Sequence, residues 1–146
     1  MSQTVQQALA AARFTTDDQD YALVKLHPRA ITAAAGVIAE LGSPFAGLLI
    51  DKDEITLVLP AFALEELGER LRGHQIATQT YRLLTLDVEL DPDLVGFMAA
   101  ISGALSDAGV SLLPYAAFSR DHLLVPAAQF ETALDALQKL KQQATS

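Results

Sequence analysis

The sequence predicts an α+β fold made of two consecutive β-α-β-β-α-β units, each an antiparallel sheet backed by helices. Three observations support this fold class: an internal repeat, the same order of strand and helix patterns in both halves, and an apolar content of 51% in a chain of 146 residues. This apolar content suffices for a packed core, and the length suits one domain or two small ones.

The repeat relates the two halves at a nearly constant spacing. Residues sixty positions apart match in four cases: Tyr21 with Tyr81, Leu23 with Leu83, Leu26 with Leu86, and Gly36 with Gly96. Residues 66 positions apart match further along: Leu57 with Leu123, Pro60 with Pro126, Leu67 with Ala133, and Leu71 with Leu137. The change of spacing predicts an insertion of about six residues in the second unit, between these two sets.

The first unit is predicted over residues 20–79. Apolar and β-branched patterns place strands at 21–26, 45–50 and 54–59, helices at 29–41 and around Leu64, Leu67 and Leu71, and a last strand within 75–80. Residues 1–19 are placed outside the repeat. They are read as an N-terminal helix carrying Val5, Leu9 and Ala12, followed by an acidic linker.

The second unit is predicted over residues 80–146. Its pattern gives a strand at 81–90, a helix at 91–109, two short strands at 110–118 and 122–125 joined by a polar turn, and a helix at 130–140. No strand follows the last helix, so this unit lacks the final strand of the pattern.

Three residues mark the expected ends of a helix, and a fourth constrains a strand. Asp91 is read as a helix N-cap and Pro92 as the first helical residue, while Gly109 suits a left-handed helix end. Pro114 has no amide for a sheet ladder, so its strand is expected at an edge or at a bulge.

The strand patterns also predict a homodimer. Residues 46–50 and 111–113 are apolar on successive positions, which places apolar side chains on both faces of a sheet. The missing last strand of the second unit would leave one sheet edge unpaired. We therefore expect the sister unit or a second chain to cover the apolar face and the unpaired edge.

Charge and composition exclude several function classes. The net charge of −8 and the pI near 4.6 argue against binding to nucleic acid or to anionic membranes. The absence of cysteine excludes disulfides, thiolate nucleophiles and iron–sulfur clusters. No signal peptide or apolar span is apparent, so a cytoplasmic protein is expected, and no cofactor is expected.

Catalytic patterns are weak. The three histidines His27, His74 and His122 are far apart and show no metal-ligand spacing on a helix, so no metal site is predicted. Residues 119–122 hold the residue types of a hydrolytic triad, but neighbours within one turn cannot reach the required geometry. The acidic residues at 51–54 lack the glycine and spacing of a calcium loop. An enzyme is therefore not expected.

The second half resembles the ACT domains, whose units have a ferredoxin-like fold. The resemblance is carried by YRLL at 81–84, LVGFMAAI at 94–101, LSDAGVS at 105–111 and DHLLVP at 121–126. Within that family the chain is similar to short tandem-ACT proteins related to the CASTOR amino-acid sensors and to aspartate-kinase regulatory regions. The first half resembles a degenerate partner unit through residues 21–26 and 54–60.

The resemblance implies a regulatory module that binds an amino acid or a similar small metabolite at an interface between units. The implied ligand-binding residues are, by position, Asp91, Asp93, Leu94, Val95 and Gly96 together with Leu112, Leu113, Pro114 and Tyr115. A helix N-terminus in this loop would suit a ligand carboxylate, and a nearby aspartate would suit an ammonium group.

Alternatives remain open at these positions. Asp91 and Asp93 can serve the helix end alone, and Gly96 can serve packing. Residues 115–118 read YAAF where relatives have a hydroxyl-rich stretch, which is compatible with an apolar ligand or with lost binding. The two alanines favour a ligand-free interaction or dimerisation module that pairs with a partner enzyme or chain. In the first unit, Arg29 could bind a carboxylate beside a pH-sensitive His27, or both can simply be solvated.

Overall fold

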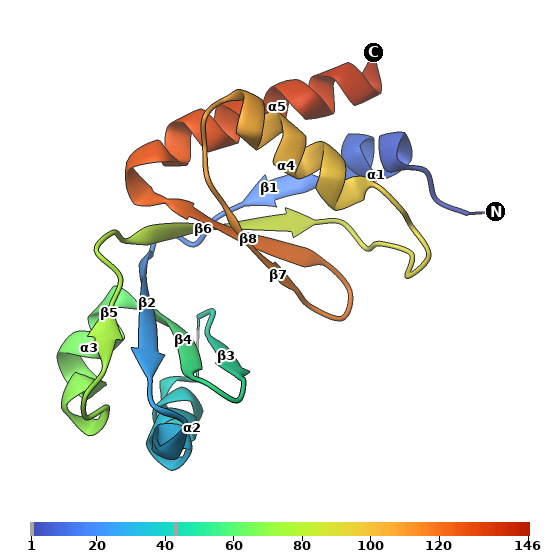
Figure 1. Cartoon of the computed structure of the whole chain (residues 1–146). Coiled ribbons are helices and arrows are strands. Elements are labelled where there is room, and N and C mark those ends of the chain that lie inside the picture. Colours follow the sequence, from blue (N-terminus) through green and yellow to red (C-terminus); the bar gives the residue numbers. More distant parts are fainter. Residues whose placement is uncertain (1, 43) are drawn as a thin grey trace. The chain divides into compact units, whose positions relative to one another are not determined.

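The chain folds into two compact units, each with the predicted alternation of strands and helices (Figure 1). A computed structural model describes residues 2–42 and 44–146. The first unit is Asp17–Tyr81, and the second unit combines Met1–Thr16 with Arg82–Ser146. The predicted fold class, α+β with two ferredoxin-like units, is confirmed.

The first unit contains the elements β2 (Asp20–Leu26), α2 (Ile31–Leu41), β3 (Gly47–Ile50), β4 (Ile55–Pro60), α3 (Ala61–Leu67) and β5 (Gln75–Ile76), with short 3₁₀ turns at Pro28–Ala30 and Gly68–Arg70. The strands lie in the order β3-β4-β2-β5, and each of these neighbouring pairs is antiparallel. The last strand, expected within 75–80, is only two residues long.

One face of this sheet holds the core of the first unit. Alternate residues of β2 and β4 meet both helices there: Ala22, Val24, Leu26, Ile55, Leu57 and Leu59 pack with Ala34, Val37, Ala63 and Leu71. On the opposite face, Tyr21 packs its ring edge-on against Phe45, with the centroids 5.9 Å apart. Its hydroxyl donates to Asp17, and burial and this acidic neighbour raise the pKa of Tyr21.

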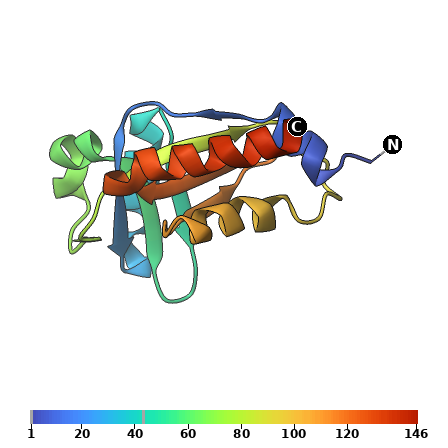
Figure 2. The same ribbon diagram turned by 90° about the horizontal axis from the view of Figure 1, so that it is seen from above.

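The second unit contains α1 (Val5–Ala11), β1 (Arg13–Thr15), β6 (Tyr81–Asp87), α4 (Phe97–Asp107), β7 (Leu113–Ala116), β8 (Asp121–Pro126) and α5 (Phe130–Thr145), with a 3₁₀ turn at Ala127–Gln129. Its strands lie in the order β7-β8-β6-β1. Figure 2 shows α4 and α5 running side by side, with α1 beside the C-terminal end of α5. These three helices and the sheet enclose one core that includes Leu9, Leu86, Ile101, Leu123 and Leu137.

The N-terminal segment supplies the strand that the second unit was expected to lack. β1 pairs antiparallel with β6, with Arg13 opposite Asp87 and Thr15 opposite Thr85. This is the sheet position that β5 occupies beside β2 in the first unit. The expectation of an unpaired edge on β6 is therefore wrong: the edge is covered by residues that precede both repeats in the chain.

The helix α4 begins at Phe97, not at the predicted Asp91–Pro92. Gly96 precedes it with a φ of +98°, a left-handed conformation that glycine adopts at little cost. The C-terminal prediction is confirmed. Gly109 has a φ of +75°, and the amides of Gly109 and Val110 donate to the carbonyls of Ser106 and Leu105, which is the Schellman pattern.

The extra residues of the second unit lie in the connection between β6 and α4. The core-facing residues of β2 and β6 correspond at a spacing of sixty, Val24 with Leu84 and Leu26 with Leu86, whereas the bounds of α2 and α4, β3 and β7, and β4 and β8 all differ by 66. The match of Gly36 with Gly96 is therefore wrong, because Gly36 lies inside α2 and Gly96 precedes α4. The insertion lies within residues 88–96, the loop implied as a ligand site.

Both β3 and β7 are edge strands. Pro114 in β7 pairs only toward β8, as its missing amide requires. In β3, Leu49 and Ile50 are 58% and 56% exposed.

Within the described residues, no helix is both long enough and apolar enough to cross a membrane.

Candidate functional site

The loop that connects β6 to α4, residues 88–96, is held by Gln3 from the N-terminal segment. The backbone amide of Gln3 donates to Asp91 Oδ2 at 2.9 Å, its side-chain oxygen accepts from the Asp91 amide at 2.9 Å, and its side-chain amide donates to the Glu89 carbonyl at 3.0 Å. Leu90 adds a bond from its amide to the Ser119 carbonyl. The loop is therefore fixed by segments far from it in sequence.

The five predicted loop residues have different environments. Asp91 is engaged with Gln3, Asp93 is exposed, and Leu94 packs against the core of the second unit. Val95 is 87% exposed, and Val5 of α1 lies 3.6 Å from where a side chain on Gly96 would begin. Asp93 and Val95 are thus the residues of this set that point freely to solvent.

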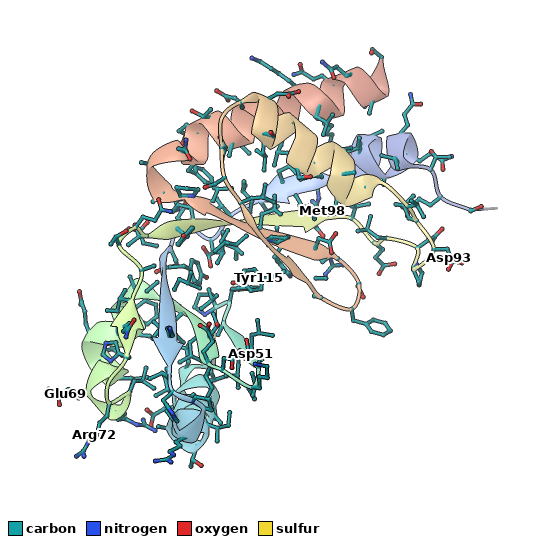
Figure 3. All side chains as sticks on the ribbon, in the orientation of Figure 1. Asp51, Glu69, Arg72, Asp93, Met98 and Tyr115 are labelled. Atoms are coloured by element: carbon teal, nitrogen blue, oxygen red, sulfur yellow. The ribbon has the colours of Figure 1, made fainter. Side chains whose placement is uncertain are left out.

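The predicted residues of the second strand lie apart from that loop. Figure 3 shows Asp93 at the far end of the loop and Tyr115 on β7, well separated within the second unit. Leu112 packs against the helix-side core, and Pro114 faces the same side opposite Leu123. Leu113 and Tyr115 face the other side of the sheet, opposite Leu124 and His122. The structure therefore does not gather the two predicted sets into one pocket.

Arg29 belongs to the first unit. It is exposed, and it lies in the 3₁₀ turn Pro28–Ala30 that follows β2. His27 caps this turn, because its Nδ1 accepts a hydrogen bond from the Arg29 amide at 3.1 Å. That bond explains the presence of a histidine here without a ligand.

A polar cluster that the sequence analysis missed lies on the sheet face of the second unit opposite its helices. Asp87 Oδ2 accepts from Arg13 at 2.7 Å, and Asp87 Oδ1 lies 3.5 Å from Arg120 Nε. Beside them, Thr85 Oγ1 and His122 Nδ1 are 2.9 Å apart. Burial, then the Arg120 charge, lower the pKa of His122, and Asp121 opposes that shift.

This cluster could be predicted only in part. Alternation along β6 and β8 puts Thr85, Asp87 and His122 on one face, but Arg13 joins them only because β1 pairs with β6. Asp87 pairs with both arginines and Thr85 bonds to His122, so these contacts link β1, β6 and β8, while the buried Arg120 Nε makes no hydrogen bond to any described residue.

Hollows also occur elsewhere among the described residues. A groove of about 670 Å³ runs between α4 and α5, with Ala99, Gly103 and Ala104 on one side and Asp135 and Lys139 on the other. A smaller hollow of about 270 Å³ lies on the first-unit sheet. Neither is lined by the predicted ligand residues. Within residues 2–42 and 44–146, no group of three or more metal-ligating side chains occurs.

Comparison with known proteins identifies related sequences and folds. The family model described as ACT domain matches residues 76–139. A solved protein of unknown function from Vibrio cholerae, described as a possible transport protein, is 23% identical, with 94% of this chain and 96% of that chain covered and a TM-score of 0.73. The regulatory subunit of aspartate kinase from Thermus thermophilus is 16% identical, covers 88% and 95%, and has a TM-score of 0.65.

A protein from Agrobacterium tumefaciens shares the fold with 17% identity, 89% coverage of both chains and a TM-score of 0.69. A search of curated proteins finds no significant match. These similarities establish the fold over both units.

Proposed function

We propose that the chain is a non-catalytic regulatory module of the ACT family, of the aspartate-kinase type that the sequence resemblance indicated, and that it binds a small metabolite, foremost an amino acid. The observation that carries the proposal is the coincidence of the domain match with the six-residue insertion in loop 88–96. Loops carry binding residues more often than the elements they connect, and this loop is longer in the second unit than its counterpart in the first.

The proposed ligand site is the solvent-facing part of this loop. Asp93 offers a carboxylate to a ligand ammonium group, and the main chain before α4 offers amides to a carboxylate. Gly96 allows close approach of the backbone. Asp91 is a positioning residue, because its carboxylate already accepts from Gln3. Residues 112–115 and Arg29 lie outside this loop. In this proposal they contact the ligand only where it is bound at an interface between units.

An amide-resolved NMR titration with each of the twenty amino acids tests this site. We expect at least one to shift the amides of residues 89–98 and Asp93→Ala to weaken its binding about tenfold, as expected for loss of one charge-assisted hydrogen bond. Asp135→Ala, an exposed aspartate on α5, is the matched control. If no amino acid shifts this loop at millimolar concentration, the site is refuted.

A second candidate function is pairing with another chain without a ligand, and the edge strand β3 favours it. It carries Leu48, Leu49 and Ile50 with large exposed surfaces and has a free edge in the first unit. Homodimerisation through this edge, or pairing with a partner enzyme in the cytoplasm, would cover it. Sedimentation velocity of the chain and of Leu49→Lys tests this function: a dimer that becomes a monomer supports it, and a monomer in both refutes the homodimer.

A further inference from the structure

A hollow of about 270 Å³ opens on the first-unit sheet, on the face opposite α2 and α3. It is lined by Leu23, Lys25, Glu54, Thr56, Gln75 and Ala77, with contributions from two neighbours. Lys25 lies at its centre, because Thr56 of β4 is opposite it on one side and Gln75 of β5 is opposite it on the other. Directly opposed residues share a face of a sheet, so these three polar side chains stand together.

Two opposite charges flank the hollow without neutralising each other. Among the described residues, neither the Lys25 ammonium nor the Glu54 carboxylate has a hydrogen-bond or ion-pair partner. Glu54 is diagonal to Lys25 across the β2–β4 ladder, a position at which Cα atoms are roughly 7–8 Å apart and long side chains can meet. The space between the two groups is thus bordered by one positive and one negative charge.

The duplicated unit supplies an internal comparison. The positions equivalent to Lys25, Thr56 and Glu54 are Thr85, His122 and Arg120 in the second unit. There the groups bond to neighbours: Thr85 Oγ1 lies 2.9 Å from His122 Nδ1, and Arg120 Nε lies 3.5 Å from Asp87 Oδ1. These positions thus hold a hydrogen bond and an ion pair in the second unit, whereas the two charged groups of the first unit make neither among the described residues.

We propose that this hollow binds a compact zwitterion, whose carboxylate contacts Lys25 and whose ammonium contacts Glu54. The Thr56 hydroxyl and the Gln75 amide supply further hydrogen bonds, and Leu23 and Ala77 supply an apolar surface for a small aliphatic group. The volume lies below the range typical of drug-sized ligands, which restricts the occupant to a small metabolite. The site is in the first unit, so it is separate from the loop of the proposed function.

Titration of the full chain with L-valine, followed by amide-resolved NMR, tests the proposal. We expect shifts at residues 23–25, 54–56 and 75–77. N-acetylvaline lacks the ammonium and valinamide lacks the carboxylate, so each should bind at least tenfold more weakly, as should valine to Lys25→Met and to Glu54→Gln.

The matched controls are Lys52→Met, an exposed lysine that pairs with Asp53, and Glu131→Gln, an exposed acid in the first turn of α5. Both should bind valine as the unchanged chain does. The proposal is overturned by the absence of shifts at the hollow, or by equal binding of valine to the test and control variants. Shifts confined to residues 89–98 would overturn it while supporting the proposed function, and shifts confined to the hollow would support it without supporting the loop site.

Discussion

Replacing Leu9 by alanine tests whether the N-terminal helix is part of the second unit. Leu9 lies on α1, is 5% exposed, and belongs to the same core as Leu86, Ile101 and Leu137. Truncation of a buried leucine removes its transfer free energy and leaves a cavity, which costs about 2–5 kcal/mol. If α1 were an appendage outside both units, the same change would cost below about 0.5 kcal/mol.

The effect should be confined to one unit. A helix of seven residues has little stability of its own, so its stability depends on packing against α4 and α5. A loss of about 2–5 kcal/mol corresponds to roughly a 30- to 4,000-fold fall in the hydrogen-exchange protection of amides that exchange by opening of the second unit. Amides of β6 and β8 should show this fall, whereas those of β2 and β4 should retain their protection.

Hydrogen exchange followed by NMR or mass spectrometry measures both units in one sample. Leu49→Ala is the control, because Leu49 is a leucine on an exposed edge and its truncation should change little. The reasoning is refuted if Leu9→Ala leaves the protection of β6 unchanged, or if it lowers the protection of β4 as much as that of β6.

Three further predictions concern local features of the chain: the glycines of the α4 region, His122 and Gln3. Gly96→Val should destabilise the chain by about 1–2 kcal/mol because of the φ of +98°, whereas Gly103→Ala, inside α4 with open space around it, should stabilise it by about 0.5–1 kcal/mol; thermal unfolding measures both. The pKa of His122 lies below its ordinary value of 6.5, so as the pH falls the His122 imidazole is protonated in the unfolded chain before it is protonated in the folded chain. The free energy of unfolding should therefore fall as the pH drops below about 6.5. His122→Gln should make the free energy of unfolding, measured in denaturant titrations, depend less on pH. Gln3→Ala should speed hydrogen exchange in residues 88–96 while changing the melting temperature little, and unchanged exchange there would show that Gln3 does not hold the loop.

Elements fixed by local chemistry were predictable from the sequence. Gly109 ends α4 because a left-handed residue is needed there, and Pro114 lies in an edge strand because it cannot donate to a ladder. The turn between β7 and β8 closes with the bond from the Ala117 amide to the Arg120 carbonyl, as the polar residues indicated. In each case the determining interaction lies within a few residues.

Features that depend on distant segments were not predictable in this way. Asp91–Pro92 has the local pattern of a helix start, but Gln3, 88 residues away, binds both the carboxylate and the amide of Asp91, and the helix starts six residues later. The pairing of β1 with β6 is equally remote, and it brings Arg13 to Asp87. The candidate site was affected most, because the loop and β7 were expected together and lie apart.

The proposed ligand loop is also held by a segment that is distant in sequence, the N-terminal segment. Gln3 makes three hydrogen bonds to the loop, and α1, which begins two residues later, is anchored by Leu9 in the core and by a bond from the Gln6 side-chain amide to the Ala144 carbonyl of α5. A ligand that requires another loop conformation must break the three Gln3 bonds, while Leu9 and Gln6 still anchor α1. Because such coupling is reciprocal, a change at Gln3 should also alter the affinity of the loop for that ligand. In the first unit, where β2 and the turn Pro28–Ala30 are separated by His27 alone, no such coupling to the N-terminal segment is built in.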